Sequence, residues 1–244
     1  MSDTHFGFRT VSAAEKTSLV RGVFDAVASR YDVMNDAMSF GLHRWWKHEF
    51  VSRIDMREGL RCLDVAGGTG DIAFRLLKRG VQHVTVCDIN QAMLEEGRRR
   101  ADDHNILHNI EWLCGNAESL PLPASSFHLY TIAFGIRNVT HIEQALAEAH
   151  RVLLPGGRFL CLEFSHVPRE TLAKLYDTYS FNVIPKLGEL IAGEREPYQY
   201  LVESIHKFPP QQEFARLIEG AGFRQVTFTN LAGGIVAIHS GYKI

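Results

Sequence analysis

Two apolar stretches of this chain each end in residues suited to holding a nucleoside. The segment LDVAGGTGD (63–71) runs into a glycine-dense turn, and VCDIN (86–90) places the acid Asp88 at the end of a second apolar run. In nucleotide-binding folds, an acid about 20 residues beyond the glycine turn holds the ribose. A carboxylate can accept two hydrogen bonds from a ribose diol, so Asp88 is predicted to bind one. Ile89 follows and is predicted to pack against the base.

The glycine turn departs from the fingerprint of dinucleotide-binding proteins. Gly67 and Gly68 carry no Cβ, so the backbone can turn sharply and approach a ligand closely. The pattern is G-G-T-G-D, and the third glycine of G-x-G-x-x-G would fall on Ile72. The turn therefore lacks the pattern that brings a pyrophosphate onto a helix N-terminus, which disfavours a nicotinamide oxidoreductase.

A third polar loop, GNAESLPLP (115–123), follows the next apolar stretch. The amide oxygen of Asn116 can accept a hydrogen bond from an adenine amino group, and the backbone N–H of Ala117 can donate to a ring nitrogen. The alternative is a polar turn that binds nothing. Because three such motifs occur together, we favour a loop that recognises adenine.

Strands that alternate with helices are expected to bring these loops to one edge of a sheet. Strand-like stretches occupy 60–66, 83–88, 110–115, 127–134 and 158–164, and amphipathic stretches occupy 70–79, 91–103 and 141–153. This alternation predicts βαβ units in a parallel sheet covered on both faces. Right-handed crossovers place the loops after the strands on one edge, where open α/β sheets bind ligands.

The N-terminal part of the chain has helical rather than alternating character. Residues 12–54 repeat apolar side chains at helical spacing, with a turn-prone break at 32–41. No core strand is expected there. We therefore predict a helical cap over 1–54 and an α/β domain over 55–244.

The C-terminal part is expected to hold a helical insertion followed by a hairpin. Residues at about 168–222 are mostly helical in pattern and are punctuated by prolines. The last two predicted strands, 223–230 and 235–242, flank Gly233-Gly234, and this spacing predicts an antiparallel hairpin.

Composition excludes several classes of protein. The formal net charge is -2 over 244 residues, which argues against a general nucleic-acid binder, and Arg98–Arg100 is interpreted as a solvated helix face. The cysteines, all in stretches expected to be buried strands, form no C-x-x-C pair, and no metal site is expected. The N-terminus lacks an apolar signal region, and no apolar run approaches the ~18 residues that span a bilayer. We expect a cytoplasmic protein.

Several motifs of the chain together match one enzyme family. They are GGTGD, CDIN, GNAESLP, LLPGGRF, YDVMNDAMSFGLHRWWK (31–47), FGIRNV (134–139), LEFS (162–165), YDTYSFNVIPKLG (176–188) and NLAGGIVAIHSGYK (230–243). The first four are shared by many class I S-adenosylmethionine-dependent methyltransferases. The longer ones resemble the ubiquinone/menaquinone biosynthesis C-methyltransferase family (UbiE-type), and the resemblance covers nearly the whole chain.

This resemblance implies a fold, a cofactor and a substrate class. The fold is Rossmann-like, with a mostly parallel seven-stranded sheet that ends in an antiparallel hairpin. S-adenosylmethionine is the implied methyl donor, and a ring carbon of a polyprenylated quinol is the implied acceptor, in ubiquinone or menaquinone synthesis. Cofactor contacts are implied for Thr69, Asp88, Asn116 and Ala117. At Ala133 the family commonly has a serine, so a contact there must come from the backbone.

The methionine end of this cofactor needs polar partners beside the glycine turn. Thr69 is predicted to hydrogen-bond to it, and Asp64, just before the turn, is predicted to face its ammonium group. The alternative for Asp64 is a solvated acid at a strand end. Asp71 is expected to be a first-turn acid of the next helix.

Methyl transfer to a quinol carbon requires alignment, exclusion of water and support for a phenolate. Arg137 is predicted to hold the phenolate or to orient a water that takes its proton, and Asn138 to orient the ring hydroxyl. Asp32 is predicted to be the general base, and Tyr31 to close over the sulfonium. The alternatives are a salt bridge for Arg137, a turn acid for Asp32 and a helix-end aromatic for Tyr31.

Other functions stay open at this point. One is a methyltransferase of another lipid or phenol, and another is a non-catalytic S-adenosylmethionine-binding subunit of a quinone-synthesis complex. The sequence does not decide between ubiquinone and menaquinone synthesis. Peripheral contact with the inner face of a membrane, membership in a quinone-synthesis complex and a homodimer are carried forward as hypotheses.

Overall fold

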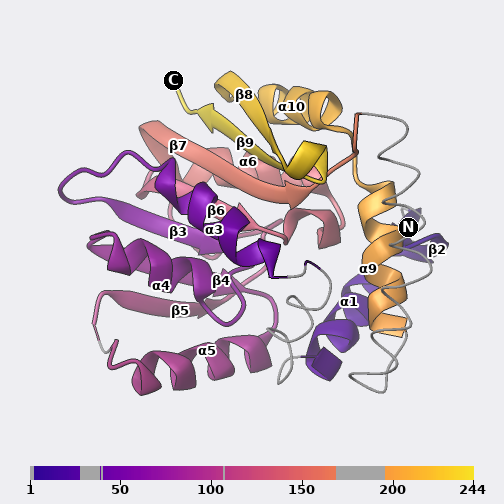
Figure 1. Cartoon of the computed structure of the whole chain (residues 1–244), viewed down its shortest axis with the longest axis horizontal. Coiled ribbons are helices and arrows are strands. Elements are labelled where there is room, and N and C mark those ends of the chain that lie inside the picture. The colour runs from indigo at the N-terminus through magenta and orange to yellow at the C-terminus, as the bar shows by residue number, and fades with distance from the viewer. Residues whose placement is uncertain (1–2, 28–38, 40, 107, 169–195) are drawn as a thin grey trace.

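The computed structural model describes residues 3–27, 39, 41–106, 108–168 and 196–244 (Figure 1). One seven-stranded sheet runs through the molecule in the order β5-β4-β3-β6-β7-β9-β8. Its strands are β3 (Arg61–Val65), β4 (His83–Asp88), β5 (Ile110–Cys114), β6 (Phe127–Ala133), β7 (Leu153–Phe164), β8 (Arg224–Leu231) and β9 (Val236–Tyr242).

The pairing of the strands confirms the predicted sheet. Strands β3 to β7 run parallel to one another, and β9 runs antiparallel to both β7 and β8. Strand β7 begins earlier than predicted because Leu153 already pairs with Phe127, ahead of a register shift. Cys114 is exposed rather than buried as expected, because β5 lies at the edge of the sheet.

Helices cover both faces of the sheet. Figure 1 shows α3 (Leu42–Ser52), α4 (Asp71–Lys78) and α5 (Gln91–Asp103) in front of the sheet, with α6 (Ile142–Val152) behind it. Helix α10 (Gln211–Gly220) packs with α6 and β8, and its Phe214 and Ile218 belong to the same core cluster as Leu146 and Phe159. The expected insertion at 168–222 thus contains a helix that is part of the core.

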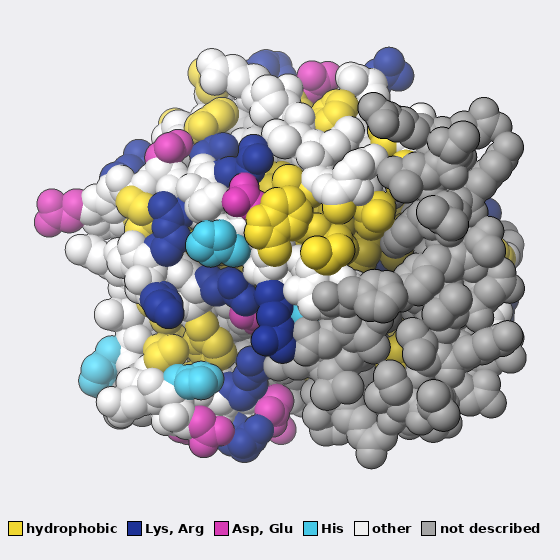
Figure 2. Space-filling view, in the orientation of Figure 1, with side chains coloured by type: hydrophobic (Ala, Val, Ile, Leu, Met, Phe, Trp, Pro, Cys, Tyr) yellow, Lys and Arg dark blue, Asp and Glu magenta, His cyan; other side chains and the backbone are white. Residues whose placement is uncertain are grey.

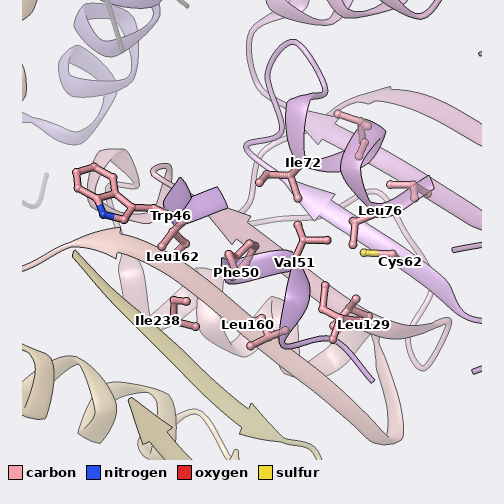
Figure 3. Packing of buried hydrophobic residues seen from close by; sticks show 14 of the residues in the cluster. Trp46, Phe50, Val51, Cys62, Ile72, Leu76, Leu129, Leu160, Leu162 and Ile238 are labelled. Atoms are coloured by element: carbon pink, nitrogen blue, oxygen red, sulfur yellow. The ribbon is translucent and has the colours of Figure 1, made fainter. Parts of the chain in front are cut away.

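Helix α3 is likewise part of the core. Phe50 and Val51 lie against Leu160 and Leu162 of β7, and Trp46 closes the end of this cluster (Figure 3). Burying one such side chain stabilises the fold by about 1.5–3 kcal/mol. The N-terminal region predicted to be a separate cap is therefore joined to the sheet through α3, which fixes the position of this helix beside the strand ends.

A smaller layer lies beside the sheet, at the right of Figure 1. It contains α1 (Ala13–Val27), α9 (Glu196–Lys207) and a hairpin of β1 (Asp3–Phe6) and β2 (Arg9–Ser12), which the sequence analysis did not predict. Phe6 stacks on Tyr200 of α9 with ring centroids 4.1 Å apart, and Val11 and Val20 complete this cluster. The hairpin thereby fixes α9 and α1 against each other.

Candidate functional site

A pocket opens where the strands of the parallel sheet end, between the sheet and α1. The space between its lining residues amounts to about 1160 Å³, including the solvent at its mouth. All nine residues predicted to contact a cofactor line it: Asp64, Gly67, Gly68, Thr69, Asp88, Ile89, Asn116, Ala117 and Ala133. Residues far apart in the sequence thus meet as the predicted sheet order requires.

The floor of the pocket is made of two strained turns that touch each other. Ala66, after β3, has φ 51°, and Phe134, after β6, has φ 57°, a region that non-glycine residues rarely adopt. A Cβ on Gly135 would lie 2.4 Å from the Cβ of Ala66, so only glycine allows the turns to approach this closely. The turns meet between β3 and β6, where the strand order reverses and open α/β sheets bind ligands.

Asp88 lies at the end of β4 and is held by backbone donors. Its Oδ2 accepts from the N–H of Gly68 at 2.9 Å, and its Oδ1 accepts from the N–H of Asn90 at 2.8 Å. Burial raises the pKa of the Asp88 carboxyl, and these hydrogen bonds oppose the shift. Asn90 itself caps α5 by accepting from Met93, so Asp88 is not needed as the cap. Each Asp88 oxygen keeps capacity to accept from a ligand.

Asp64 is the most unusual carboxyl of the pocket. It is 1% exposed, and its Oδ1 accepts from the hydroxyl of Thr131 at 2.8 Å. Its Oδ2 has no hydrogen-bond partner among the described residues. Burial, together with the nearby acids, raises the pKa of Asp64 to about 7. A Cβ on Gly67 would lie 2.8 Å from this Oδ2, so only a glycine leaves room for the oxygen at this position.

Thr69 is oriented by Arg100, a residue that the sequence predicted to lie on a solvated helix face. Arg100 of α5 donates from its guanidinium to the Thr69 hydroxyl at 2.7 Å. The interpretation of Arg98–Arg100 as a solvated face is therefore wrong for Arg100. This side chain is half-buried and reaches the glycine turn, whereas Arg98 and Arg99 are exposed. Arg99 does face solvent, where it pairs with Glu96 and Asp103.

The loop after β5 is braced by its own polar groups. The Asn116 side-chain oxygen accepts from the N–H of Glu118 at 2.9 Å, and the Asn116 carbonyl accepts from the N–H of Ser119 at 3.0 Å. Glu118 in turn accepts from the N–H of Thr140 at 2.9 Å. These bonds fix the loop against the turn after β6, and the Asn116 oxygen retains a second lone pair for a base.

The two residues predicted to handle the substrate after β6 have different surroundings. Asn138, in the short helix η2 (Ile136–Asn138), lines the pocket, and its side-chain oxygen accepts from the hydroxyl of Tyr200 at 3.0 Å. Arg137 is 8% exposed and is not among the described lining residues. It donates to Glu163 at 2.7 Å and to the carbonyl of Phe134 at 2.6 Å. The salt bridge considered as an alternative for Arg137 is thus present.

Glu163 is fully engaged in this pair. Besides the guanidinium, it accepts from the backbone N–H groups of Arg137 and Phe164 at 3.4 and 2.9 Å. Burial raises the pKa of the Glu163 carboxyl, and the charge of Arg137 opposes the shift. With three donors on one carboxylate, the geometry is that of an ion pair.

Tyr31 and Asp32 lie outside the described residues. The structure instead adds polar lining residues that sequence reasoning did not select, among them Arg21 of α1, Lys47 of α3 and Asp71 of α4. Lys47 occupies the buried stripe of its helix, where the spacing from Phe50 and Val51 called for an apolar residue. A lysine at a position where the helical spacing calls for an apolar residue is the sequence signal from which Lys47 could have been selected as a site residue.

In the described part of the chain, no group of three or more His, Cys, Asp or Glu residues is arranged to hold a metal ion. Nor does any described helix combine the length and apolarity needed to cross a bilayer.

Known proteins are similar to this chain over nearly its whole length. A model of the ubiE/COQ5 methyltransferase family matches residues 10–243. The chain is 55% identical to the mitochondrial 2-methoxy-6-polyprenyl-1,4-benzoquinol methylase of Drosophila melanogaster, over 99% of this chain and 85% of the relative. It is 56% identical to the ubiquinone/menaquinone biosynthesis C-methyltransferase UbiE of Paracoccus denitrificans, over 99% of this chain and 97% of the relative.

Solved structures support the fold. A putative methyltransferase complexed with the Trm112 activator of Haloferax volcanii matches with a TM-score of 0.67 and 17% identity, covering 92% of this chain and 97% of that one. A possible histamine N-methyltransferase of Thermotoga maritima matches with a TM-score of 0.63 and 20% identity, covering 91% of this chain and all (100%) of that one. At this identity the likeness establishes the architecture alone.

Proposed function

Because the chain belongs to the ubiE/COQ5 methyltransferase family, we propose that it transfers the methyl group of S-adenosylmethionine to a ring carbon of a polyprenylated quinol. The observation that carries the proposal is the match over residues 10–243 to a family whose relatives are named for this reaction. The relatives carry names from both ubiquinone and menaquinone synthesis. Both quinols are therefore candidate acceptors.

The polar groups of the pocket suit the parts of this cofactor. We assign the ribose diol to Asp88, the adenine to Ile89 and to the Asn116–Ala117 loop, and the ammonium group to Asp64. Thr69, Gly67, Gly68 and the backbone at Ala133 complete the contacts. The orphaned, buried Oδ2 of Asp64 supports a cationic ligand, because an ammonium group would supply the missing hydrogen bond.

On the acceptor side, the chain has to orient a quinol hydroxyl and favour its ionised form. The cofactor would supply a sulfonium methyl, and its sulfur would leave as a neutral thioether without acid catalysis, so alignment is the main requirement. Asn138 is placed to orient the hydroxyl, since Tyr200 fixes its side chain at the pocket wall. Arg137, paired with Glu163, lies behind this wall and holds η2 in place, while Asp32 and Tyr31 stay proposed as general base and sulfonium cover.

The test uses purified protein, S-adenosylmethionine labelled in the methyl group and two reduced acceptors. One acceptor is a 2-methoxy-6-polyprenyl-1,4-benzoquinol and the other is demethylmenaquinol. We expect label on a ring carbon of at least one of them, and the ratio of rates shows which synthesis the enzyme serves. Tight cofactor binding without transfer to either acceptor would contradict the proposal, leaving another lipid or phenol, or a non-catalytic subunit. Sedimentation of the same sample tests the predicted homodimer.

We also propose that the N-terminal half of α3 contacts a lipid bilayer. Leu42 and Trp45 are 46% and 45% exposed, and Arg44 and His48 are exposed on the same helix. Figure 2 shows a hydrophobic patch in this region, bordered by basic side chains. An exposed tryptophan beside basic residues suits the interface of an anionic membrane, where a polyprenylated substrate would be found.

Flotation with phosphatidylcholine vesicles, with and without phosphatidylglycerol, tests this surface. We expect the double variant Leu42→Ser/Trp45→Ser to lose most binding to the anionic vesicles. Phe8→Ser is the matched control, because Phe8 is an equally exposed apolar side chain on the N-terminal hairpin. Equal binding by the wild type and the double variant would overturn the proposal.

A further inference from the structure

A buried lysine lies at the end of the pocket next to the glycine turn. Lys47 is only 6% exposed, because it belongs to the face of α3 that packs on the sheet, although its side chain is charged. Its Nζ donates to Oδ2 of Asp71 at 2.7 Å, and both residues line the pocket. Burying a lysine costs free energy unless a partner compensates the charge, so this placement calls for an explanation.

The partner of Lys47 is shared with a second cation. Oδ1 of Asp71 accepts from Nε of Arg75, one helical turn along α4, at 2.8 Å. Although burial alone would raise the pKa of the Asp71 carboxyl, Lys47 and Arg75 lower it to about 2. The cluster of Lys47, Asp71 and Arg75 therefore contains two positive charges and one negative charge. Its surplus positive charge is available to an anion in the pocket.

A carboxyl oxygen without a hydrogen-bond partner among the described residues lies at the same end of the pocket. Oδ2 of Asp64 lacks a hydrogen-bond partner among the described residues, and a Cβ on Gly67 would lie 2.8 Å from it. Lys47 and Asp71 are close enough to influence the titration of Asp64. A surplus cation and an orphaned carboxyl oxygen in one corner match an amino-acid zwitterion, which presents a carboxylate and an ammonium group on the same α-carbon.

We propose that Lys47 binds the α-carboxylate of the cofactor, with Asp71 and Arg75 as positioning residues. The assignment rests on the proposed function, since it takes the ligand to be S-adenosylmethionine. It divides recognition into two ends: the zwitterion is held between α3 and the β3–α4 turn, and the ribose is held by Asp88. Because α3 is packed into the core through Phe50 and Val51, Lys47 holds the carboxylate from a rigid element.

Three ligands that differ in one charged group at a time test the assignment. S-adenosylhomocysteine has both the α-carboxylate and the ammonium group. Decarboxylated S-adenosylhomocysteine keeps only the ammonium group, and 5′-methylthioadenosine has neither. Calorimetry of each ligand with the wild type and with Lys47→Met gives six dissociation constants. No quinol and no turnover are needed for this measurement.

We expect Lys47→Met to weaken binding of S-adenosylhomocysteine about 10- to 100-fold, as for loss of a charged hydrogen bond. Binding of the other two ligands should change less than about twofold, because they have no carboxylate to lose. Arg21→Met is the matched control, since Arg21 is the exposed cation of α1 on the same pocket. Lys47→Arg should recover most of the affinity, and melting temperatures check that each variant is folded.

Several results would overturn the assignment. They are an unchanged affinity in Lys47→Met, an equal loss for all three ligands, and a carboxylate-specific loss in Arg21→Met instead. If the wild type binds none of the three ligands, the proposed function fails and the assignment fails with it. If the wild type binds S-adenosylhomocysteine and Lys47→Met binds it equally well, the assignment alone fails.

Discussion

The two sides of the pocket use their polar groups in opposite ways. On the side formed by the turns after β3 and β4, Asp64 and Asp88 accept only from a hydroxyl and from backbone N–H groups, and one Asp64 oxygen accepts nothing from the described residues. On the side formed by η2 and α9, Arg137 is paired with Glu163, and Asn138 is bonded to Tyr200.

This difference indicates that the side after β3 and β4 binds ligand, whereas the side formed by η2 and α9 supports the shape of the pocket. Unsatisfied acceptors in a buried pocket cost folding free energy, and a ligand with donors at those positions recovers it. Groups that satisfy each other rigidify the wall, and they contribute geometry more than affinity. We therefore expect changes on the first side to act on cofactor binding, and changes on the second side to act on stability and on quinol positioning.

The largest effect is expected from breaking the buried ion pair. Glu163→Leu leaves Arg137 without its partner, and should lower the free energy of unfolding by about 3–5 kcal/mol in urea denaturation. The double variant Arg137→Met/Glu163→Leu should recover most of this loss, because neither charge is then buried alone. The exposed pair of Arg99 and Asp103 is the control, and Asp103→Ala should leave the free energy of unfolding nearly unchanged, because solvent screens an exposed ion pair. A Glu163→Leu cost as small as that of the control would contradict the account.

A smaller, ligand-specific effect is expected for the ribose carboxylate. Asp88→Asn replaces one acceptor oxygen by an amino group, so the dissociation constant of S-adenosylhomocysteine should rise about 10- to 100-fold. Asp102→Asn, an exposed carboxyl of α5, is the matched control. The distinction between the two sides would be wrong if Asp88→Asn lowered the free energy of unfolding as much as Glu163→Leu and left the dissociation constant of S-adenosylhomocysteine unchanged.

The smallest effect is expected on the acceptor side of the pocket wall. Tyr200→Phe removes the hydroxyl that donates to Asn138, a loss of about 1 kcal/mol of positioning. KM for the quinol should rise about fivefold, with the affinity for S-adenosylhomocysteine unchanged. Tyr242→Phe, on β9, should change neither value. A Tyr200→Phe variant that loses cofactor affinity instead would show that the two sides are not separate.

Most of the sheet could be predicted because its strands are continuous apolar runs between glycine and polar turns. The hairpin β1–β2 escaped prediction, because each strand has four residues and only Phe6 and Val11 reach a core cluster. Strand order then placed Asp64, Asp88 and Asn116 on one edge without further information. That order follows from connection rules, which act on whole elements rather than on single side chains.

The ionic partners could not be predicted in the same way. Lys47 lies 24 residues from Asp71 and Arg137 lies 26 residues from Glu163, and no local pattern connects residues that far apart. Their pairing depends on how α3 and the end of β7 are packed. Arg137 was therefore predicted as a free cation beside the substrate, whereas in the structure its charge is already compensated by Glu163.

Asp64 makes the contrast between the two sides measurable by pH. Its pKa of about 7 in the folded protein lies above its ordinary value of 3.8. The stability that it contributes is therefore fully present below about pH 4 and is lost as pH rises through 7. An ammonium ligand favours the ionised carboxylate, so binding at pH 6 should displace the proton of Asp64.

Calorimetry of S-adenosylhomocysteine binding at pH 6, in two buffers with different heats of ionisation, measures that displaced proton directly. We expect the wild type to release close to one proton, because a group with a pKa of about 7 is mostly protonated at that pH. Asp64→Asn should release almost none, and its affinity should also be lower. Binding without proton release in the wild type, or equal release in Asp64→Asn, would contradict the claim that this side of the pocket awaits a cation.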